Sequence, residues 1–386
     1  MRVVHVYRTY FPDPPGGLQE AIRQICLATH AQGVETKIFT LSPNPHPRQM
    51  EFAEGSVIRS KSWAAPSSCD LGGIDSVREF RALTDWADIV HYHFPWPFAD
   101  VLRILAGRGK PSVMTYHSDI LRQRRLASLY DPLMRKTLGA MSAVVATSPA
   151  YARTSPVLTR LVPRDRLRVI PLGIADFSHA IGSGSAAPAG LERLALGDHP
   201  FFLALGVLRY YKGLHTLIEA ATAVDAMIVI AGSGPEQERL QVLAREREAS
   251  NVVFAGQVSD KEKAALLCRC RALVLPSHLR SEAFGMVLVE AAMFARPMIC
   301  CEVGSGTSYV NVHGETGFVV PPESPKELAH AMNRLLADST LADRMGAAAR
   351  QRYERLFSGH ALTTAYVRLY EEVLQNGKAV AVGYRG

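Results

Sequence analysis

The stretch Ser281-Glu-Ala-Phe-Gly-Met-Val-Leu-Val-Glu290 follows an apolar run, Ala272-Leu-Val-Leu-Pro276, with the composition of a buried strand. Its own apolar residues predict a helix that begins near Gly285, with Glu282 ahead of the helix and Glu290 inside it. A helix start exposes unpaired backbone N–H groups and the positive end of the helix dipole. The stretch therefore predicts a site for an anion such as a phosphate.

The two carboxylates of this stretch allow two interpretations. In the first, Glu282 contacts a sugar and Glu290, about two helical turns further on, contacts a ribose. In the second, both are acidic residues that merely stabilise a helix N-terminus through its dipole. The spacing alone does not separate these interpretations, so the other motifs of the chain matter.

The rest of the chain alternates between strand-like and helix-like segments. The first half predicts strands near 3–7, 34–41, 87–93, 112–116, 143–147 and 167–170, and helices at 18–31 and 120–138. Residues 42–80 are expected to be irregular, apart from a short strand near 57–58. The second half predicts strands at 201–205, 227–231, 252–255, 273–275, 298–301 and 318–320. Its helices are expected near 213–223, 235–248, 259–268, 286–294 and 324–337, and 340–376 is expected to be helical throughout.

This alternation predicts an α/β protein of two doubly wound halves with parallel sheets and a ligand cleft between them. A length of 386 residues also favours two domains. The Ala-, Gly- and Ser-rich segment 178–198 is interpreted as their connection, with a short helix at 191–194. The predicted domains are therefore 1–177 and 199–357.

Composition limits the class of protein. The chain is 48% hydrophobic and 20% charged, which is ordinary for a soluble globular protein, and no apolar run approaches a membrane span. Arg8 interrupts the apolar N-terminus too early for a signal peptide. Six cysteines without a CxxC pair favour free thiols in a reducing cytoplasm over a zinc site.

The net charge of +7 is concentrated in one segment. Residues 101–170 hold thirteen Lys and Arg against three Asp. Such a segment attracts acidic head groups or phosphate-bearing substrates, and a solvated basic surface is the alternative. Nucleic acid is not expected, because no recognisable nucleic-acid motif accompanies the charge.

Histidines and a basic loop supply further candidates. His117 follows a predicted strand at its carboxyl end, where it serves either a ligand or the structure. His91 and His93 on the neighbouring strand suggest a metal with His117, but no other spacing supports one and no metal is predicted. Arg209 and Lys212 follow another strand and suit a leaving diphosphate, or simply cap a loop.

Two absences narrow the chemistry. The glycine pair at 16–17 does not form the dinucleotide fingerprint G-x-G-x-x-G, which argues against a Rossmann dehydrogenase. The chain contains no Asp-x-Asp triplet, which argues against a diphosphate bridged by a metal.

These motifs, in their order along the chain, resemble the retaining glycosyltransferases of family four, which have the GT-B fold. The resemblance rests on Gly16-Gly17, His117-Ser-Asp119, Pro171-Leu-Gly173, Lys212-Gly213 and Glu282-x7-Glu290. Four longer strings are similar to bacterial mannosyl- and rhamnosyltransferases of surface-polysaccharide assembly: His5-Val-Tyr-Arg-Thr-Tyr-Phe-Pro-Asp13, Tyr116-His-Ser-Asp-Ile120, Gly206-Val-Leu-Arg-Tyr-Tyr-Lys-Gly213 and Gly306-Thr-Ser-Tyr-Val-Asn311.

The resemblance implies transfer of a hexose, with mannose or a deoxyhexose such as rhamnose favoured, from a nucleotide diphosphate sugar to a saccharide or lipid-linked saccharide. It implies retention by front-face attack, without metal or cofactor, and a GDP-sugar is favoured over a UDP-sugar. The second domain would bind the donor and the first the acceptor, with a last helix, 358–376, packing back on the first domain. The protein would be cytoplasmic, with peripheral association at the inner membrane left open.

The resemblance also implies roles for individual residues. Glu282 would contact the transferred sugar, Lys212 the diphosphate, and His117 the donor sugar near the reacting carbon. The donor-binding set would be Gly16, Gly17, Ala283, Phe284, Gly285, Met286 and Glu290, with Glu290 on the ribose. The family commonly has Arg where this chain has Val207, and Arg209 would replace it. Arg122, Arg124 and Arg125 would suit an anionic membrane surface or acceptor.

Other functions share this architecture. A nucleotide-sugar 2-epimerase would act on the donor without an acceptor, and a non-catalytic protein would only bind the nucleotide sugar. The base and sugar of the donor, the acceptor, the linkage and the oligomeric state are not determined by these motifs.

Overall fold

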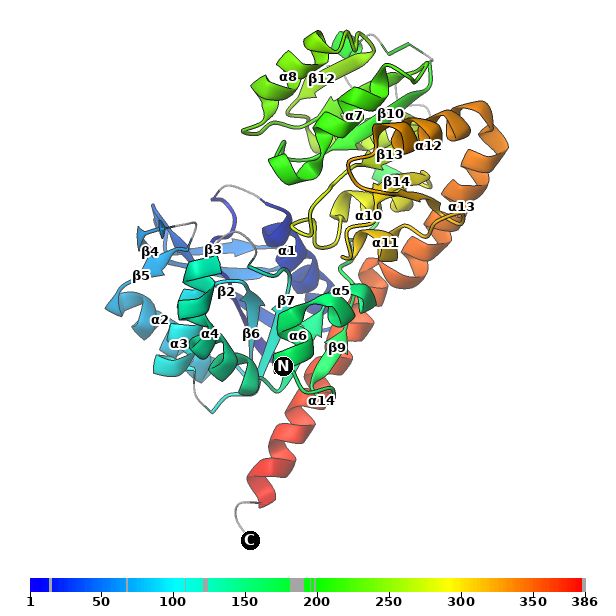
Figure 1. The fold of residues 1–386 in the computed structure, drawn as a ribbon. Helices are drawn as coiled ribbons and strands as arrows, with labels where there is room; N and C mark the ends of the chain where they lie inside the picture. The colour runs from blue at the N-terminus through cyan, green and yellow to red at the C-terminus, as the bar shows by residue number, and fades with distance from the viewer. Residues whose placement is uncertain are drawn as a thin grey trace. The chain divides into compact units, whose positions relative to one another are not determined.

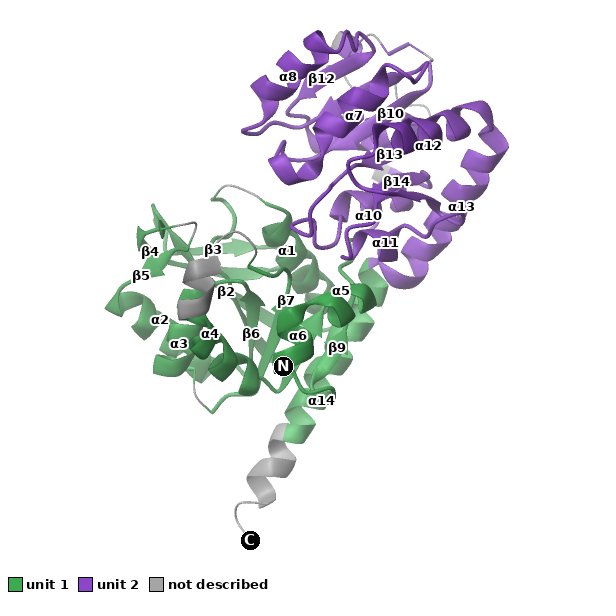
Figure 2. Cartoon of the chain, in the orientation of Figure 1, with its two compact units in different colours: residues 1–175, 359–386 green, residues 176–358 purple. Residues whose placement is uncertain are grey.

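The computed structural model describes residues 1–13, 16–66, 69–107, 109–120, 124–180, 191–194, 196–197 and 199–383, with the backbone alone at 124–129, 180, 193 and 377–383. The chain forms two compact units (Figure 2). Unit 1 comprises Met1–Ala175 and Gly359–Gly386, and unit 2 comprises Asp176–Ser358. Each unit is a doubly wound α/β domain, as predicted.

Unit 1 is built on a sheet in the order β3-β4-β2-β1-β6-β7-β8-β9, with β5 paired to β4. The strands are β1 (Arg2–Val6), β2 (Glu35–Ser42), β3 (Gln49–Phe52), β4 (Gly55–Ala64), β5 (Leu71–Gly72), β6 (Ile89–Phe94), β7 (Ser112–Tyr116), β8 (Ala143–Ala146) and β9 (Leu167–Val169). The pairs with β3 and β5 are antiparallel and the others are parallel. The strand order reverses between β1 and β6, which places the ligand-binding edge of such a sheet at their carboxyl ends.

Helices cover both faces of this sheet (Figure 1). They are α1 (Gly17–His30), α2 (Ile74–Trp86), α3 (Pro97–Ala106), α4 (Arg124–Gly139), α5 (Pro149–Thr154), α6 (Pro156–Leu161) and the last helix, α14 (Gly359–Gly383). On one face, Ile25 of α1 and Tyr366 of α14 join Val3 in a buried cluster. The Thr363 hydroxyl of α14 also donates to the Ala28 carbonyl of α1 at 2.9 Å. The C-terminal helix is therefore part of the core of unit 1.

Unit 2 has a fully parallel sheet in the order β12-β11-β10-β13-β14-β15. Its strands are β10 (Phe201–Leu205), β11 (Met227–Ala231), β12 (Val252–Gly256), β13 (Ala272–Leu275), β14 (Met298–Cys301) and β15 (Gly317–Val320). Its helices are α7 (Leu214–Ala221), α8 (Gln237–Glu246), α9 (Asp260–Arg269), α10 (Met286–Met293), α11 (Thr307–Val310), α12 (Pro325–Ala337) and α13 (Ser339–Leu356). The order reverses between β10 and β13, so the loops after these two strands meet at one point of the sheet edge.

The expectation of an irregular segment at 42–80 is wrong. It contains β3, β4, β5 and the start of α2, and β4 alone spans ten residues. The predicted short strand near 57–58 lies within β4, and the full extent of β4 was missed because it buries polar residues in place of an apolar alternation. Arg59 is 4% exposed and its guanidinium donates to the Ser42 hydroxyl at 2.9 Å and to the Asn44 carbonyl at 2.8 Å.

Three helix predictions also need correction. The segment 340–376 is not one helix, since α13 ends at Leu356 and α14 begins at Gly359, with the buried Phe357 between them. The helix at 97–106 was not predicted. The predicted helix at 191–194 is a short 3₁₀ turn over Glu192–Leu194.

No helix among the described residues combines the length and the apolar character needed to cross a bilayer.

Candidate functional site

The loops after β10 and β13 touch at the strand-order reversal of unit 2. Gly213 makes this contact possible, because it has φ +66° and a Cβ added there would lie 2.0 Å from the Pro276 carbonyl oxygen. The backbone N–H of His278 also donates to the Tyr211 carbonyl at 3.1 Å. The loop that carries Arg209 and Lys212 is thereby held against the segment that carries Glu282.

Lys212 and Glu282 form an ion pair at this contact. The Lys212 ammonium lies 2.5 Å from Oε2 of Glu282, which also accepts from the Ser277 hydroxyl at 3.2 Å. Burial lowers the pKa of Lys212, but the Glu282 carboxylate and the Tyr211 ring outweigh it and the pKa is raised overall. The pair therefore keeps a charged ammonium in a largely buried position, against a carboxylate oxygen that the Ser277 hydroxyl also holds.

The backbone of the Glu282 segment is held by the loop after β14. The Ser305 hydroxyl donates to the Glu282 carbonyl at 2.6 Å, and the Gly306 N–H donates to the Ala283 carbonyl at 2.8 Å. A Cβ at Gly306 would approach the Phe284 ring to 2.7 Å, so this position must be glycine for the two loops to pack. The loop after β14 thus fixes the turn that leads into α10.

Helix α10 begins where the sequence predicted, with Gly285 as its N-cap at φ +84° and Met286 as its first residue. Glu290 lies inside the helix and pairs with Lys263 of α9 at 2.9 Å. Burial opposes a charge on Lys263, yet the Glu290 carboxylate and Asp260 raise its pKa overall. The two carboxylates of the opening stretch are therefore each held by a lysine, not left as a bare acidic helix start.

Arg209 and Val207 lie on the same loop as Lys212, and both are exposed. Val207 is 44% exposed, which is unusual for a large apolar side chain. Arg209 precedes the 3₁₀ turn Tyr210–Lys212. The structure places Arg209 on the loop where a replacement for the family arginine is predicted, but it does not test that role.

Unit 1 contributes His117 and the glycine pair. His117 follows β7 and its backbone N–H donates to the Phe94 carbonyl at 3.2 Å. Gly16 is the N-cap of α1 and Gly17 its first residue. A Cβ at Gly17 would meet nothing within 4 Å, and one at Gly16 would meet only the end of the Gln19 side chain. Packing within unit 1 therefore does not explain this glycine pair.

His117 belongs to a group of four buried histidines. His93 lies between His117 and His5, with Nδ1 3.0 Å from Nε2 of His117 and Nε2 3.0 Å from Nδ1 of His5. Burial lowers the pKa of His5 and of His117 to about 3. Burial also lowers the pKa of His91 and His93 well below its ordinary value. All four imidazoles are therefore neutral at physiological pH.

Three of these histidines are close enough to hold a metal ion. One ring nitrogen from each of His5, His91 and His93 lies within 4.8 Å of the others. However, His91 is already hydrogen-bonded at both nitrogens, to the Tyr370 hydroxyl and to the Thr115 hydroxyl, each at 2.7 Å. Because His93 is likewise bonded at both nitrogens, hydrogen bonding accounts for the cluster without a metal.

The basic segment is only partly described. Arg122 lies outside the described residues, and the side chains of Arg124 and Arg125 at the start of α4 also lie outside them. Further along, Arg135 and Arg160 both pair with Asp131. Part of the basic charge is thus neutralised within unit 1, and the predicted membrane contact stays a prediction.

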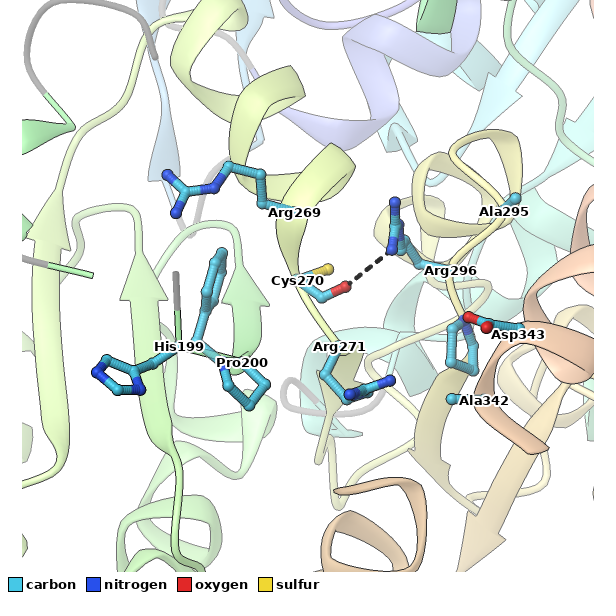
Figure 3. A pocket seen from close by; sticks show the side chains of 11 residues that line it. His199, Pro200, Arg269, Cys270, Arg271, Ala295, Arg296, Ala342 and Asp343 are labelled. Carbon is cyan, nitrogen blue, oxygen red and sulfur yellow. Dashed lines mark hydrogen bonds between the residues drawn. The ribbon is translucent and has the colours of Figure 1, made fainter. Parts of the chain in front are cut away.

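A separate pocket of about 320 Å³ opens at the opposite edge of the unit 2 sheet (Figure 3). It lies at the amino ends of β10, β13 and β14, near Phe201, Arg271 and Pro297. Two of its arginines already hold backbone carbonyls, Arg269 that of Gly197 and Arg296 those of Cys268 and Cys270. Because the pocket lies at the amino ends of the strands and the Lys212–Glu282 pair lies at their carboxyl ends, the two are separate sites.

The structure brings Lys212 and Glu282 together and places Glu290 beyond them, inside helix α10. The sequence interpretation did not include Lys263 or Ser277; it placed the loop Gly304–Thr307 near the phosphates of a nucleotide, but did not expect Ser305 to hold Glu282. The only local signal near Lys263 was the capping box of Ser259 and Glu262 that begins α9. Nothing near Ser277 or Ser305 in the sequence indicated that their hydroxyls hold Glu282.

Comparison with known proteins identifies the family. Residues 15–176 match Glycosyltransferase Family 4, and residues 192–352 match Glycosyl transferases group 1. The D-rhamnosyltransferase WbpZ of Pseudomonas aeruginosa is 44% identical over 93% of this chain and 92% of its own length. The O-antigen chain mannosyltransferase C of Escherichia coli is 39% identical over 97% of this chain and 100% of its own.

Solved structures agree at the level of the fold. The sucrose-phosphate synthase of Thermosynechococcus elongatus has a TM-score of 0.79 at 22% identity, covering 97% of this chain and 99% of its own. Anabaena HepE in complex with UDP has a TM-score of 0.77 at 16% identity, covering 96% and 100%. The predicted family is confirmed: the chain belongs to the GT-B glycosyltransferases of family four.

Proposed function

We propose that this glycosyltransferase moves mannose, or a deoxyhexose such as rhamnose, from a GDP-sugar to a saccharide or lipid-linked saccharide of a surface polysaccharide, with retention and without a metal. The observation that carries the proposal is the buried Lys212–Glu282 pair at the strand-order reversal of unit 2. The names of the two relatives that are 44% and 39% identical support the choice of sugar and pathway class.

The proposed chemistry uses charges that this loop cluster already holds. The donor diphosphate would meet the Lys212 ammonium and the exposed Arg209 guanidinium at the N-terminal side of α10. The bond between the anomeric carbon and the phosphate oxygen breaks, and the acceptor oxygen bonds to the same face of that carbon. The acceptor proton passes to the departing phosphate oxygen. Because the acceptor oxygen attacks the face that the phosphate leaves, the anomeric configuration is retained, and no protein nucleophile takes part.

Glu282 and Glu290 would divide the donor between them. The Glu282 carboxylate, oriented by Lys212 and Ser277, would accept hydrogen bonds from hydroxyls of the transferred sugar. Glu290, held by Lys263 further along α10, would accept from the ribose hydroxyls. Sugar hydroxyls are good donors to carboxylates, and such bonds to charged groups contribute about 1.5–3 kcal/mol each.

Unit 1 would receive the acceptor, with His117 meeting the donor sugar. The basic segment around Arg124 would attract the phosphate of a lipid-linked acceptor, which would place the enzyme on the cytoplasmic face of a membrane. Liposome flotation at low and high salt tests this part. Binding to anionic vesicles that weakens with salt supports it, and no binding at either salt concentration overturns it.

The decisive experiment is transfer by the purified full chain from a panel of GDP- and UDP-sugars to saccharide acceptors, with and without a chelator. NMR of the product reads the anomeric configuration. Glu282→Gln is expected to lower kcat at least a hundredfold, whereas the control Glu238→Gln, on the exposed surface of α8, should leave it unchanged. Inversion, loss of activity with chelator, or an epimer formed from the donor alone would each contradict the proposal.

A further inference from the structure

The outer end of a chain of hydrogen-bonded imidazoles in unit 1 is His117. The chain runs from His117 through His93 to His5, with a ring nitrogen separation of 3.0 Å at each step. These side chains are buried, His117 at 5% exposed being the most open of the three. β1 and β6 pair in parallel with His5 beside His91, which places His93 further along the same face of the sheet. The rings are stacked, with centroids 5.3 Å apart for both successive pairs.

His91 holds the chain in place from the side. Its ring centroid lies 4.4 Å from that of His93 and 4.7 Å from that of His5. The Tyr370 hydroxyl of α14 and the Thr115 hydroxyl of β7 fix the orientation of His91 itself. The stacked rings therefore cannot turn independently of the C-terminal helix.

A hydrogen-bonded chain of neutral imidazoles permits only two proton arrangements. Each neutral ring carries one N–H and one lone pair, so a ring that donates on one side must accept on the other. In the first arrangement the proton is on Nδ1 of every ring, and His117 accepts at Nε2 from His93. In the second arrangement the proton is on Nε2 of every ring, and His117 donates to His93. The ring nitrogen that is protonated in His5, at the inner end, therefore determines which ring nitrogen is protonated in His117, at the outer end.

The inner end favours the first arrangement. Nε2 of His5 is buried, and no described residue forms a hydrogen bond with it. The first arrangement leaves a lone pair there, and the second leaves an N–H. Among buried backbone groups, an N–H without a partner is rarer than an under-satisfied acceptor, and the same preference is taken to hold for this ring nitrogen. At the outer end, Nδ1 of His117 then carries a proton.

We propose that His93 and His5 are positioning residues that hold His117 in the tautomer with its proton on Nδ1. No described residue bonds this Nδ1, so it can donate to an oxygen of the donor sugar or its phosphate. The inference rests on the proposed function for the identity of that ligand, but not for the tautomer itself. This positioning role gives a reason for the buried chain of histidines that ends at His117, the residue proposed to contact the donor sugar.

Nitrogen NMR of the full chain, labelled with ¹⁵N in the histidine rings, tests the tautomer directly. Assignment by single substitution should show that His117, His93 and His5 are each protonated at Nδ1 and not at Nε2. A His117 protonated at Nε2 would overturn the proposal. So would a stoichiometric metal ion in protein purified without a chelator, because the lone pairs of the cluster would then bind the metal.

Two substitutions of His93 separate positioning from packing. An Asn side chain can donate from its amide nitrogen in place of Nδ1–H, whereas Phe fills the space without a donor. His93→Phe is expected to lower kcat about ten- to a hundredfold with a smaller change in the donor KM, and to leave His117 as a mixture of tautomers. His93→Asn should restore kcat to within a few-fold and restore the single tautomer.

The outcomes distinguish this inference from the proposed function. If the wild-type chain transfers no sugar, the function fails while the NMR result still decides the tautomer. If His93→Phe and His93→Asn lose activity equally with His117 unchanged in the spectrum, the positioning role is refuted. Should His93→Phe not fold, His5→Leu against His5→Asn makes the same comparison one ring further in.

Discussion

Acidification should destabilise unit 1, because its buried histidines are neutral in the core and take up protons once unfolding exposes them. The ordinary pKa of each is 6.5 when exposed, whereas burial lowers it to about 3 in His5 and His117 and well below 6.5 in His91 and His93. When the pKa of a group is depressed in the folded state, the free energy of unfolding falls as the pH drops from the unfolded pKa of the group toward its folded pKa. The window of loss is therefore from about pH 6.5 down to about pH 3.

The magnitude follows from the number of protons. Each proton taken up only by the unfolded state lowers the free energy of unfolding by about 1.36 kcal/mol per pH unit. Between pH 6.5 and pH 5, His5 and His117 each lower the free energy of unfolding by about 2 kcal/mol, or about 4 kcal/mol together, and His91 and His93 lower it further in the same direction. A typical domain has only about 5–15 kcal/mol to lose. The groups packed around the cluster, Cys26, Tyr366 and Tyr370, are neutral in this range and do not offset the loss. The buried Asp100 of unit 1, whose pKa burial raises to about 7, opposes part of the loss because it takes up its proton in the folded state.

The chain offers a selective probe for this measurement. Its three tryptophans, at 63, 86 and 96, all belong to unit 1, so tryptophan fluorescence during urea unfolding reports on unit 1 by itself. The free energy of unfolding should fall steeply from pH 7 to pH 5. In His93→Asn the fall should be smaller, because one buried histidine is removed, and in His199→Gln, which alters an exposed histidine of unit 2, it should be unchanged. A flat pH dependence in the wild type would refute the reasoning.

Three further substitutions test single contacts. Gly213→Ala should destabilise unit 2 by several kcal/mol and raise the donor KM, because its Cβ would lie 2.0 Å from a carbonyl oxygen of the β13 loop. The control Gly314→Ala has a similar φ of +78° but nothing within 4 Å of its Cβ, so it should cost only about 1–2 kcal/mol. Equal effects of the two substitutions would contradict this reasoning. Lys263→Met should weaken nucleotide binding measured by calorimetry, since Glu290 loses its ion pair with Lys263, and unchanged affinity would remove Glu290 from the ribose site. Tyr370→Phe should lower the free energy of unfolding by about 1–3 kcal/mol in the fluorescence assay by leaving a buried histidine nitrogen unpaired, and no change would show that this bond is not stabilising.

The sequence was most informative where local rules and tertiary packing agree. The apolar run before Pro276 and the glycine at 285 predicted a strand and a helix start, and both lie at these positions. Glycines and apolar strands follow rules that operate over a few residues. The family resemblance also rested on short strings, and the 44% identity to a rhamnosyltransferase confirms the family.

Prediction was least accurate where side chains are satisfied by distant partners. Only a short piece of strand β4 was predicted, because its buried Arg59 finds acceptors at and just beyond the end of β2. The pairing of Lys263 with Glu290 joins two helices, and no spacing along the chain indicates it. His91 and His93 were visible as a pair, but their bonds to the C-terminal helix and to His5 were not.

The sequence by itself determined the α/β class, the position of the loop glycines and the residues that carry charge at strand ends, because each depends on local periodicity and backbone freedom. Only the tertiary structure decided which charges meet. Strand order brings the ends of β10 and β13 together, and with them Lys212 and Glu282, which are seventy residues apart in the chain. An ion pair depends on distance in space, and that distance is set by the topology of the sheet.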